Sequence, residues 1–167
     1  MLDLGRKEKD FELKGIREFM EALNREADSI ADKALSGMIE ASIIIRRAMD
    51  KQPSRRVPVD QGNLRASWFT ATTRGTGESG EEFKGKNKQK LEADHQVAKA
   101  AALRAVRSAS PRNPTLLMGF SANYAVYVHE NLEAKFKRTG AGPRFLEAAM
   151  KNNTNQIIEA IKRRAKK

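Results

Sequence analysis

Residues 57–68 read VPVDQGNLRASW, and the rest of the chain is arranged on either side of this stretch. Pro58 fixes its own φ and pushes Val57 toward an extended conformation, so a helix arriving from upstream must end by about this point. Asp60 and Gly62 favour a turn, and the Asp60 carboxylate can accept hydrogen bonds from the amides of a following helical turn. The stretch therefore predicts a compact corner that sets a helix against a strand.

About one turn of helix is expected at residues 64–66, followed by a strand over 67–73, SWFTATT, which is rich in aromatic and β-branched residues. Trp68 is the only tryptophan, and we interpret it as a core anchor, with an interface role as the alternative. The residues expected to shape the corner are Pro58, Asp60, Gly62, Leu64, Arg65 and Trp68.

Upstream of the corner, apolar residues recur every three or four positions from Ile16 to Ala48, which predicts one long helix with a single apolar stripe. Asp28-Ser29 offers a point at which this helix could break in two. Residues 10–14, DFELK, alternate apolar and polar and favour a short edge strand. The stripe is longer than one small sheet would cover, so we weigh an ordinary core against a partial contact with a neighbouring subunit and favour the core.

Downstream, residues 74–113 depart from the globular pattern. They begin with a Gly-rich charged run that predicts a mobile loop and continue into an alanine-rich helical segment. The apolar side of that segment is thin, which predicts a protruding loop-helix arm, an extended hairpin inserted between the strand at 67–73 and a second, antiparallel strand at 115–120.

The last third of the sequence predicts a short helix at 122–130, a third strand around 134–138, and a closing helix that begins at Pro143. The fold expected for residues 1–167 is therefore one α+β domain: a long N-terminal helix and a C-terminal helix packed on a small antiparallel sheet, with the charged arm protruding.

The composition indicates a cytoplasmic globular protein, with no signal peptide and no apolar run of the roughly 20 residues that span a bilayer. The chain has no cysteine and two histidines, which excludes disulfides and thiol catalysis and disfavours a zinc site. The net charge is +11, yet residues 1–50 carry 9 basic and 11 acidic groups, so the positive charge lies after the first helix. This field favours nucleic acid or an acidic protein surface as a partner, and a merely solvated surface is the alternative.

Three short stretches match known functional motifs in part, but the neighbouring residues contradict each match. GTGESG at 75–80 and GEEFKGK at 80–86 resemble phosphate-binding loops, but acidic residues crowd both, and Asn87 stands where a Walker loop needs Ser or Thr. His129-Glu130 begins like a zinc-protease helix but lacks the second histidine. The sequence thus predicts no catalytic residues, no metal and no cofactor, and hence no enzyme.

Three blocks together resemble the minor capsid, neck and tail-completion proteins of tailed double-stranded DNA bacteriophages, over residues 10–73 and 114–162. The matching residues are Pro58, Asp60, Gly62, Leu64, Arg65 and Ser67 in the first block, Gly119, Tyr124, Ala125 and Glu130 in the second, and Pro143, Phe145, Leu146 and Ala149 in the third. The segment 74–113 is longer than the hairpin expected at that place.

The resemblance implies a structural virion protein that assembles in the host bacterial cytoplasm. It would form a homo-oligomeric ring of six or twelve copies at the head-tail junction. Its neighbours would be head-connector and tail-terminator or tail-tube proteins, genomic DNA would pass with non-specific contact at most, and no membrane would be involved. The alternative is a basic DNA-binding or DNA-packaging accessory protein.

Two further sets of candidate residues come from the short helix at 122–130 with the start of the closing helix, and from the charge. Candidate interface residues are Tyr124, Tyr127, His129, Glu130, Arg144 and Phe145. Candidates for contact with DNA or an acidic partner are Arg55, Arg56, Lys84, Lys86, Lys88, Lys90, Lys162, Arg163 and Arg164.

Overall fold

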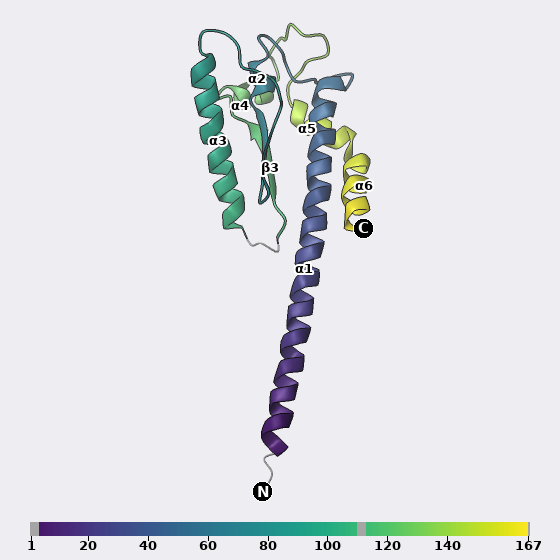
Figure 1. The fold of residues 1–167 in the computed structure, drawn as a ribbon. Helices are drawn as coiled ribbons and strands as arrows, with labels where there is room; N and C mark the ends of the chain where they lie inside the picture. The colour runs from purple at the N-terminus through teal and green to yellow at the C-terminus, as the bar shows by residue number, and fades with distance from the viewer. Residues whose placement is uncertain (1–3, 110–112, 167) are drawn as a thin grey trace.

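A computed structural model describes residues 4–109 and 113–166, with side chains described from residue 16 onward. Six helices and a three-stranded antiparallel sheet make up this part of the chain, which confirms the α+β class. The sheet lies between helix α3 on one side and helices α1, α5 and α6 on the other (Figure 1).

Helix α1 runs without interruption from Leu4 to Lys51. The predicted edge strand at 10–14 is wrong, because these residues belong to the helix, and the predicted break at Asp28-Ser29 does not occur. A strand there would have no sheet edge to pair with, since the sheet lies beside the other end of α1. The N-terminal half of α1 extends well beyond the rest of the fold (Figure 1).

The structure of the corner agrees closely with the sequence prediction. Helix α1 ends at Lys51, Val57 donates its amide to the carbonyl of Met49 at 2.8 Å, and the single turn α2 spans Asn63–Ala66. Gly62 stands before α2 with a φ of 94°, a conformation that glycine adopts without strain. Asp60 does not cap α2, because Gly62 occupies the cap position and the Asp60 carboxylate pairs with Lys137 instead.

The sheet has the strand order β2-β1-β3, with β1 at Trp68–Thr72, β2 at Gly75–Glu78 and β3 at Leu116–Phe120. The expected antiparallel pairing of the two apolar strands is confirmed, with Trp68 opposite Phe120. The third strand is β2, from the segment predicted to be a mobile loop, and the predicted strand at 134–138 is an irregular loop instead. Glycine and threonine suffice for β2 because it is an edge strand whose side chains are mostly exposed.

Helix α3, Lys88–Ser108, packs against the sheet, so the prediction of a protruding arm at 74–113 is wrong for its described residues. Phe69 of β1 and Phe83 are buried, and so is Val106 of α3 itself. The buried face of the helix also includes His95 and Lys99. These two polar residues interrupt the apolar pattern, which is why the sequence underestimates the packing of this helix. Residues 110–112 of the predicted arm lie outside the described part.

The C-terminal helical region is broken at Asn153 into α5, Phe145–Asn152, and α6, Thr154–Ala165, and Pro143 lies before the first helix instead of starting it. The short helix predicted at 122–130 is present as α4, Ala125–Glu130. Helix α6 runs back along α1, and an added Cβ on Gly37 would lie 2.7 Å from the Cα of Ile161. The bend at Asn153 therefore returns the chain onto the first helix (Figure 1).

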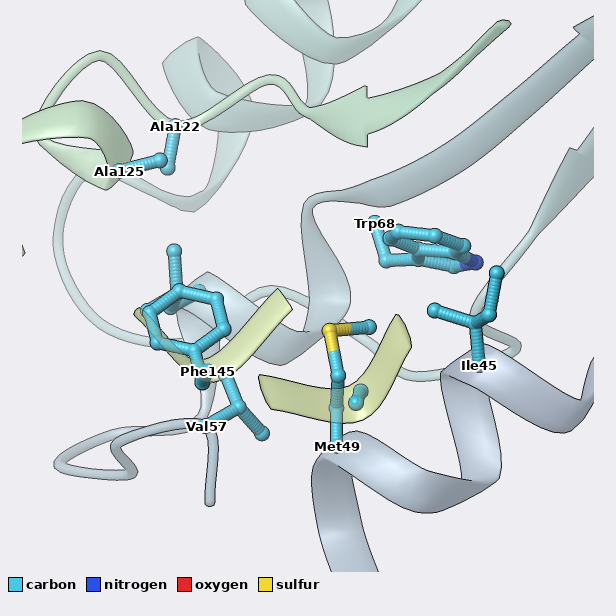
Figure 2. Close-up of a cluster of buried hydrophobic side chains, with 9 residues drawn as sticks. Ile45, Met49, Val57, Trp68, Ala122, Ala125 and Phe145 are labelled. Carbon is cyan, nitrogen blue, oxygen red and sulfur yellow. The ribbon is translucent and has the colours of Figure 1, made fainter. Parts of the chain in front are cut away.

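The main core joins the C-terminal end of α1, the corner, the sheet, α4 and α5 (Figure 2). Trp68 is 3% exposed and meets Phe120 edge to face at 5.4 Å between ring centroids, which confirms its expected role as a core anchor. Phe145 is fully buried, so its assignment to an interface is wrong. Among the helices described, none combines the length and hydrophobicity needed to cross a bilayer.

Candidate functional site

A groove of about 830 Å³ opens on the surface beside the corner, and we call it the corner groove. It joins three segments: the corner itself, the loop before α3 together with the first turns of α3, and the chain around α4. Its lining includes Pro58, Asp60, Gly62, Leu64, Lys84, Lys86, Lys90, Leu91, Asp94, Tyr124, Val128 and Phe136. Residues predicted for the corner, for an interface and for contact with an acidic partner thus meet in one place.

The Asn63 side chain fastens the loop before α3 to the corner. Its Oδ1 accepts a hydrogen bond from the amide of Lys84 at 2.7 Å, and its Nδ2 donates to the Lys84 carbonyl at 3.0 Å. Gln61 lies against Gly85, where an added Cβ would be 2.9 Å from the Gln61 Oε1. The wall of the groove that carries Lys84 and Lys86 is therefore fixed by side chains of the corner.

The floor of the corner groove is apolar. Leu64 is buried, and Leu91, Val128 and Phe136 are partly buried. Tyr124 is 39% exposed, and its pKa is raised by burial of the ring and by the negative charge of Asp60. The phenol therefore stays protonated at neutral pH and presents a neutral ring and hydroxyl to the groove.

The rim of the groove is basic. Lys84, Lys86 and Lys90 are exposed, whereas the Asp60 carboxylate is held by the Lys137 ammonium at 3.0 Å. Asp94 is the second acidic group of the lining. An apolar floor with a basic rim is suited to binding an amphipathic segment that carries acidic side chains.

Beneath the corner, Arg65 belongs to a partly buried network of ion pairs. Its guanidinium lies 3.0 Å from Asp50 and 2.6 Å from Glu81, and Arg46 contacts the same two carboxylates at 2.6 and 3.3 Å. Arg138 adds hydrogen bonds to the carbonyls of Val57 and Asp50. Arg65 therefore ties α1 to the corner and to the chain after β2, and it is occupied within its own chain.

A second surface feature lies at the opposite end of the molecule. On the N-terminal half of α1, the apolar stripe is exposed: Ile16 by 61%, Phe19 by 63%, Met20 by 51%, Leu23 by 49% and Ile30 by 54%. Residues 16–23, which we call the free half of α1, are all exposed and carry two acidic side chains and one basic side chain. Farther along the same helix, α6 and the sheet cover the stripe, and Ala41, Ile45 and Met49 are buried there.

The remaining interface candidates gather around a smaller apolar hollow of about 320 Å³ next to α4. His129 and Glu130 line it, together with Val126 and the edge of the buried Phe145. His129 Nδ1 lies 2.6 Å from the Glu130 carboxylate, and its ring meets Phe145 at 4.9 Å. Tyr127 is 69% exposed on the outer side of α4. Arg144 takes a φ of 52° before α5 and has Glu147 at 3.8 Å.

Of the basic residues predicted to contact DNA or an acidic partner, some line the corner groove and others lie elsewhere, most of them in contact with other groups of the chain. Lys84, Lys86 and Lys90 line the groove, whereas Lys88 lies between Glu82 and Glu92. Arg163 and Arg164 both pair with Glu40 of α1, and these contacts lower the pKa of that carboxyl. Lys162 has Glu159 at 3.5 Å. Arg55 is exposed with a φ of 53°, and the Arg56 Nε donates to the Gln52 carbonyl at 2.5 Å.

The sequence interpretation missed the parts of the groove that depend on tertiary contacts, namely Asn63, Asp94, Phe136 and Lys137. Only Asn63 carries a local signal, because asparagine after glycine in a turn commonly bonds to nearby backbone. Within the described residues, no three histidine or acidic side chains lie close enough to hold a metal ion. No protein-family model, no curated protein and no solved structure matches this chain.

Proposed function

We propose that this chain is a structural protein of a tailed double-stranded DNA phage virion, one that forms a homo-oligomeric ring at the head-tail junction. The ring joins the head connector to the tail and lets DNA pass. Each subunit acts through protein contacts, without catalysis and without a cofactor. The proposal combines the three sequence blocks that resemble neck and tail-completion proteins with the surfaces of the folded domain.

The observation that carries the proposal is the free half of α1. A single chain leaves Ile16, Phe19, Met20 and Leu23 between 49% and 63% exposed on a helix that reaches beyond its own domain. Exposed apolar stripes of this kind mark surfaces that other proteins cover. A subunit with one such projecting surface and a groove elsewhere has the two different surfaces that a ring subunit needs.

The test is the location of the protein in the phage that encodes it. We expect mass spectrometry of purified virions to detect the chain, and particle imaging with a labelled copy to place it at the neck. Loss of the gene should yield filled heads and separate tails. Purified, infectious virions that lack the chain altogether would show that the proposal is wrong.

A second candidate function, DNA binding, is favoured by the three lysines on the groove rim and by the net charge of +11. It predicts tight binding of duplex DNA by the isolated protein, with an affinity that falls steeply as salt increases. Replacement of Lys84, Lys86 and Lys90 by Gln should reduce that salt slope by about one unit per lost phosphate contact. A structural ring protein should instead bind duplex DNA weakly, and the three replacements should leave that binding nearly unchanged.

A further inference from the structure

Two surfaces of this chain have matching chemistry and lie too far apart to meet within one molecule. One is the free half of α1, an apolar stripe on an acidic segment, and the other is the corner groove, an apolar floor with a basic rim. We propose that the free half of α1 from one copy docks into the corner groove of the next copy. The inference rests on the proposed ring and names the contact between its subunits.

The spacing of the stripe fits a helix lying in a groove. Ile16, Phe19, Met20 and Leu23 stand at positions i, i+3, i+4 and i+7, the pattern by which amphipathic helices anchor in apolar grooves. These anchors span about 10 Å of helix, which is two turns. All four side chains are exposed, so they are available to a partner without any change in the helix.

The charges on the two surfaces are complementary. Two acidic side chains and one basic side chain lie between residues 16 and 23. The groove has Lys84, Lys86 and Lys90, while one of its two acidic groups, Asp60, is already paired with Lys137. Two free halves of α1 brought together would instead face each other with the same excess of negative charge. Electrostatics therefore favours the contact between stripe and groove over a contact between two stripes.

The geometry requires a second copy. Leu23 and Lys51 lie on one continuous helix, and at 1.5 Å per residue they are about 40 Å apart. The corner groove begins only a few residues beyond Lys51, so the free half cannot fold back into it without breaking α1. A contact that joins two different surfaces is head-to-tail, and such contacts close into rings when the rotation between copies permits.

The first experiment separates the two surfaces with variants at exposed positions. Phe19→Asp should disable the stripe, and Lys84→Glu with Lys86→Glu should disable the groove rim, each lowering self-association by at least about tenfold in light scattering. A mixture of the two variants should form a one-to-one dimer, because one intact stripe and one intact groove remain. Circular dichroism checks that both variants are folded. A groove variant that associates as wild type does would overturn the proposal in favour of stripe-to-stripe pairing.

The second experiment detects the contact even when association is weak. The chain has no cysteine, so Leu23→Cys in one copy and Tyr124→Cys in another provide a single possible mixed disulfide. We expect this pair to cross-link under mild oxidation. The matched control is Arg25→Cys, exposed on the opposite side of the same helix, which should not cross-link to Tyr124→Cys. Equal cross-linking from positions 23 and 25, or none from position 23, would overturn the docking.

These measurements use the purified protein, so their outcome is independent of the proposed virion function. Cross-linking by a protein that virions lack would preserve the docking and remove the neck assignment. A neck protein that fails both experiments would preserve the assignment and remove the docking.

Discussion

Gly37 shows how a single residue sets the distance between two helices. A Cβ added at this position would lie 2.7 Å from the Cα and 3.1 Å from the carbonyl oxygen of Ile161, both backbone atoms of α6. Backbone atoms cannot rotate away as a side chain does, so α6 as a whole would have to move. The close approach also brings Glu40 within reach of Arg163 and Arg164.

We predict that Gly37→Ala destabilises the domain by about 1–2 kcal/mol, although alanine favours helix. The gain in helix propensity is about 0.5–1 kcal/mol, whereas overpacking of this kind costs about 1–3 kcal/mol. Equilibrium urea unfolding measures the difference. The control is Gly119→Ala, where an added Cβ has nothing within 4 Å, so stability should stay within about 1 kcal/mol of wild type. A stabilising Gly37→Ala would mean that α1 and α6 do not pack this closely.

His95 is the residue through which pH should act on the fold. It is 4% exposed, its Nδ1 lies 2.8 Å from the Ser121 Oγ, and its ring meets Phe69 and Phe83 edge to face. Burial lowers its pKa below the ordinary value, and Lys99, paired with Glu78, lies one helical turn away on the same face.

Stability should therefore fall as the pH drops below about 6.5, where an unfolded imidazole begins to take up a proton. Below that pH the unfolded chain binds more protons at this site than the folded chain, so the free energy of unfolding rises with pH. The contribution of His95 is complete above about 6.5 and is lost as the pH falls toward its lower folded-state pKa. Urea unfolding at several pH values should show this slope, and His95→Asn should flatten it. An unchanged slope in the variant would assign the effect to other groups.

At the scale of the element, α3 distinguishes a packed helix from a free arm. Val106 is fully buried against the sheet, whereas Val97 on the same helix is 70% exposed. We predict that Val106→Ala lowers stability by about 1–3 kcal/mol through lost burial and a residual cavity, and that Val97→Ala changes it by less than about 0.5 kcal/mol. Urea unfolding of the two variants makes the comparison. If both substitutions changed the stability equally little, α3 would be a protruding arm and not a helix packed on the sheet.

Sequence patterning predicted the elements whose local signal agrees with their tertiary role. Pro58 and Gly62 mark the corner, the aromatic residues of 67–73 mark β1, and the regular stripe from Ile16 marks α1. Sequence patterning failed where the structure of a segment depends on the element that it packs against. Strand β2 has few strand-forming residues and exists because β1 offers an edge. Helix α3 buries His95 and Lys99, whose polar groups find partners outside the helix in Ser121 and Glu78.

The candidate site was likewise predictable from the sequence only in part. Corner residues and lysines were identified singly, from turn chemistry and charge, but the groove that joins them was not predictable. It depends on Asn63 holding the backbone of Lys84 and on α4 bringing Tyr124 to the same place. Arg55, Arg56, Arg163 and Arg164 were grouped with the lysines by charge alone, although the last two are paired within the chain.

For the whole molecule, the free half of α1 is a part that projects beyond the other elements (Figure 1). The side chains of residues 16–23 are all exposed, whereas Asp32, farther along α1, pairs with Arg74 of the turn between β1 and β2. Helix ends that contact little else contribute little to stability. The exposed stripe is therefore hydrophobic surface that the fold does not bury, and under the proposed docking it is the surface that another copy covers.

Removal of residues 1–23 should thus leave the domain folded and prevent its assembly. We predict a urea midpoint close to that of the full chain, because the core around Ile45, Met49 and Trp68 and the packing of α6 on α1 remain intact. Light scattering should show a monomer at concentrations where the full chain associates. The matched control is removal of the C-terminal residues 166–167, which should change neither property. A truncated chain that unfolds would place part of the free half in the core, and one that still associates would exclude this segment as the assembly surface.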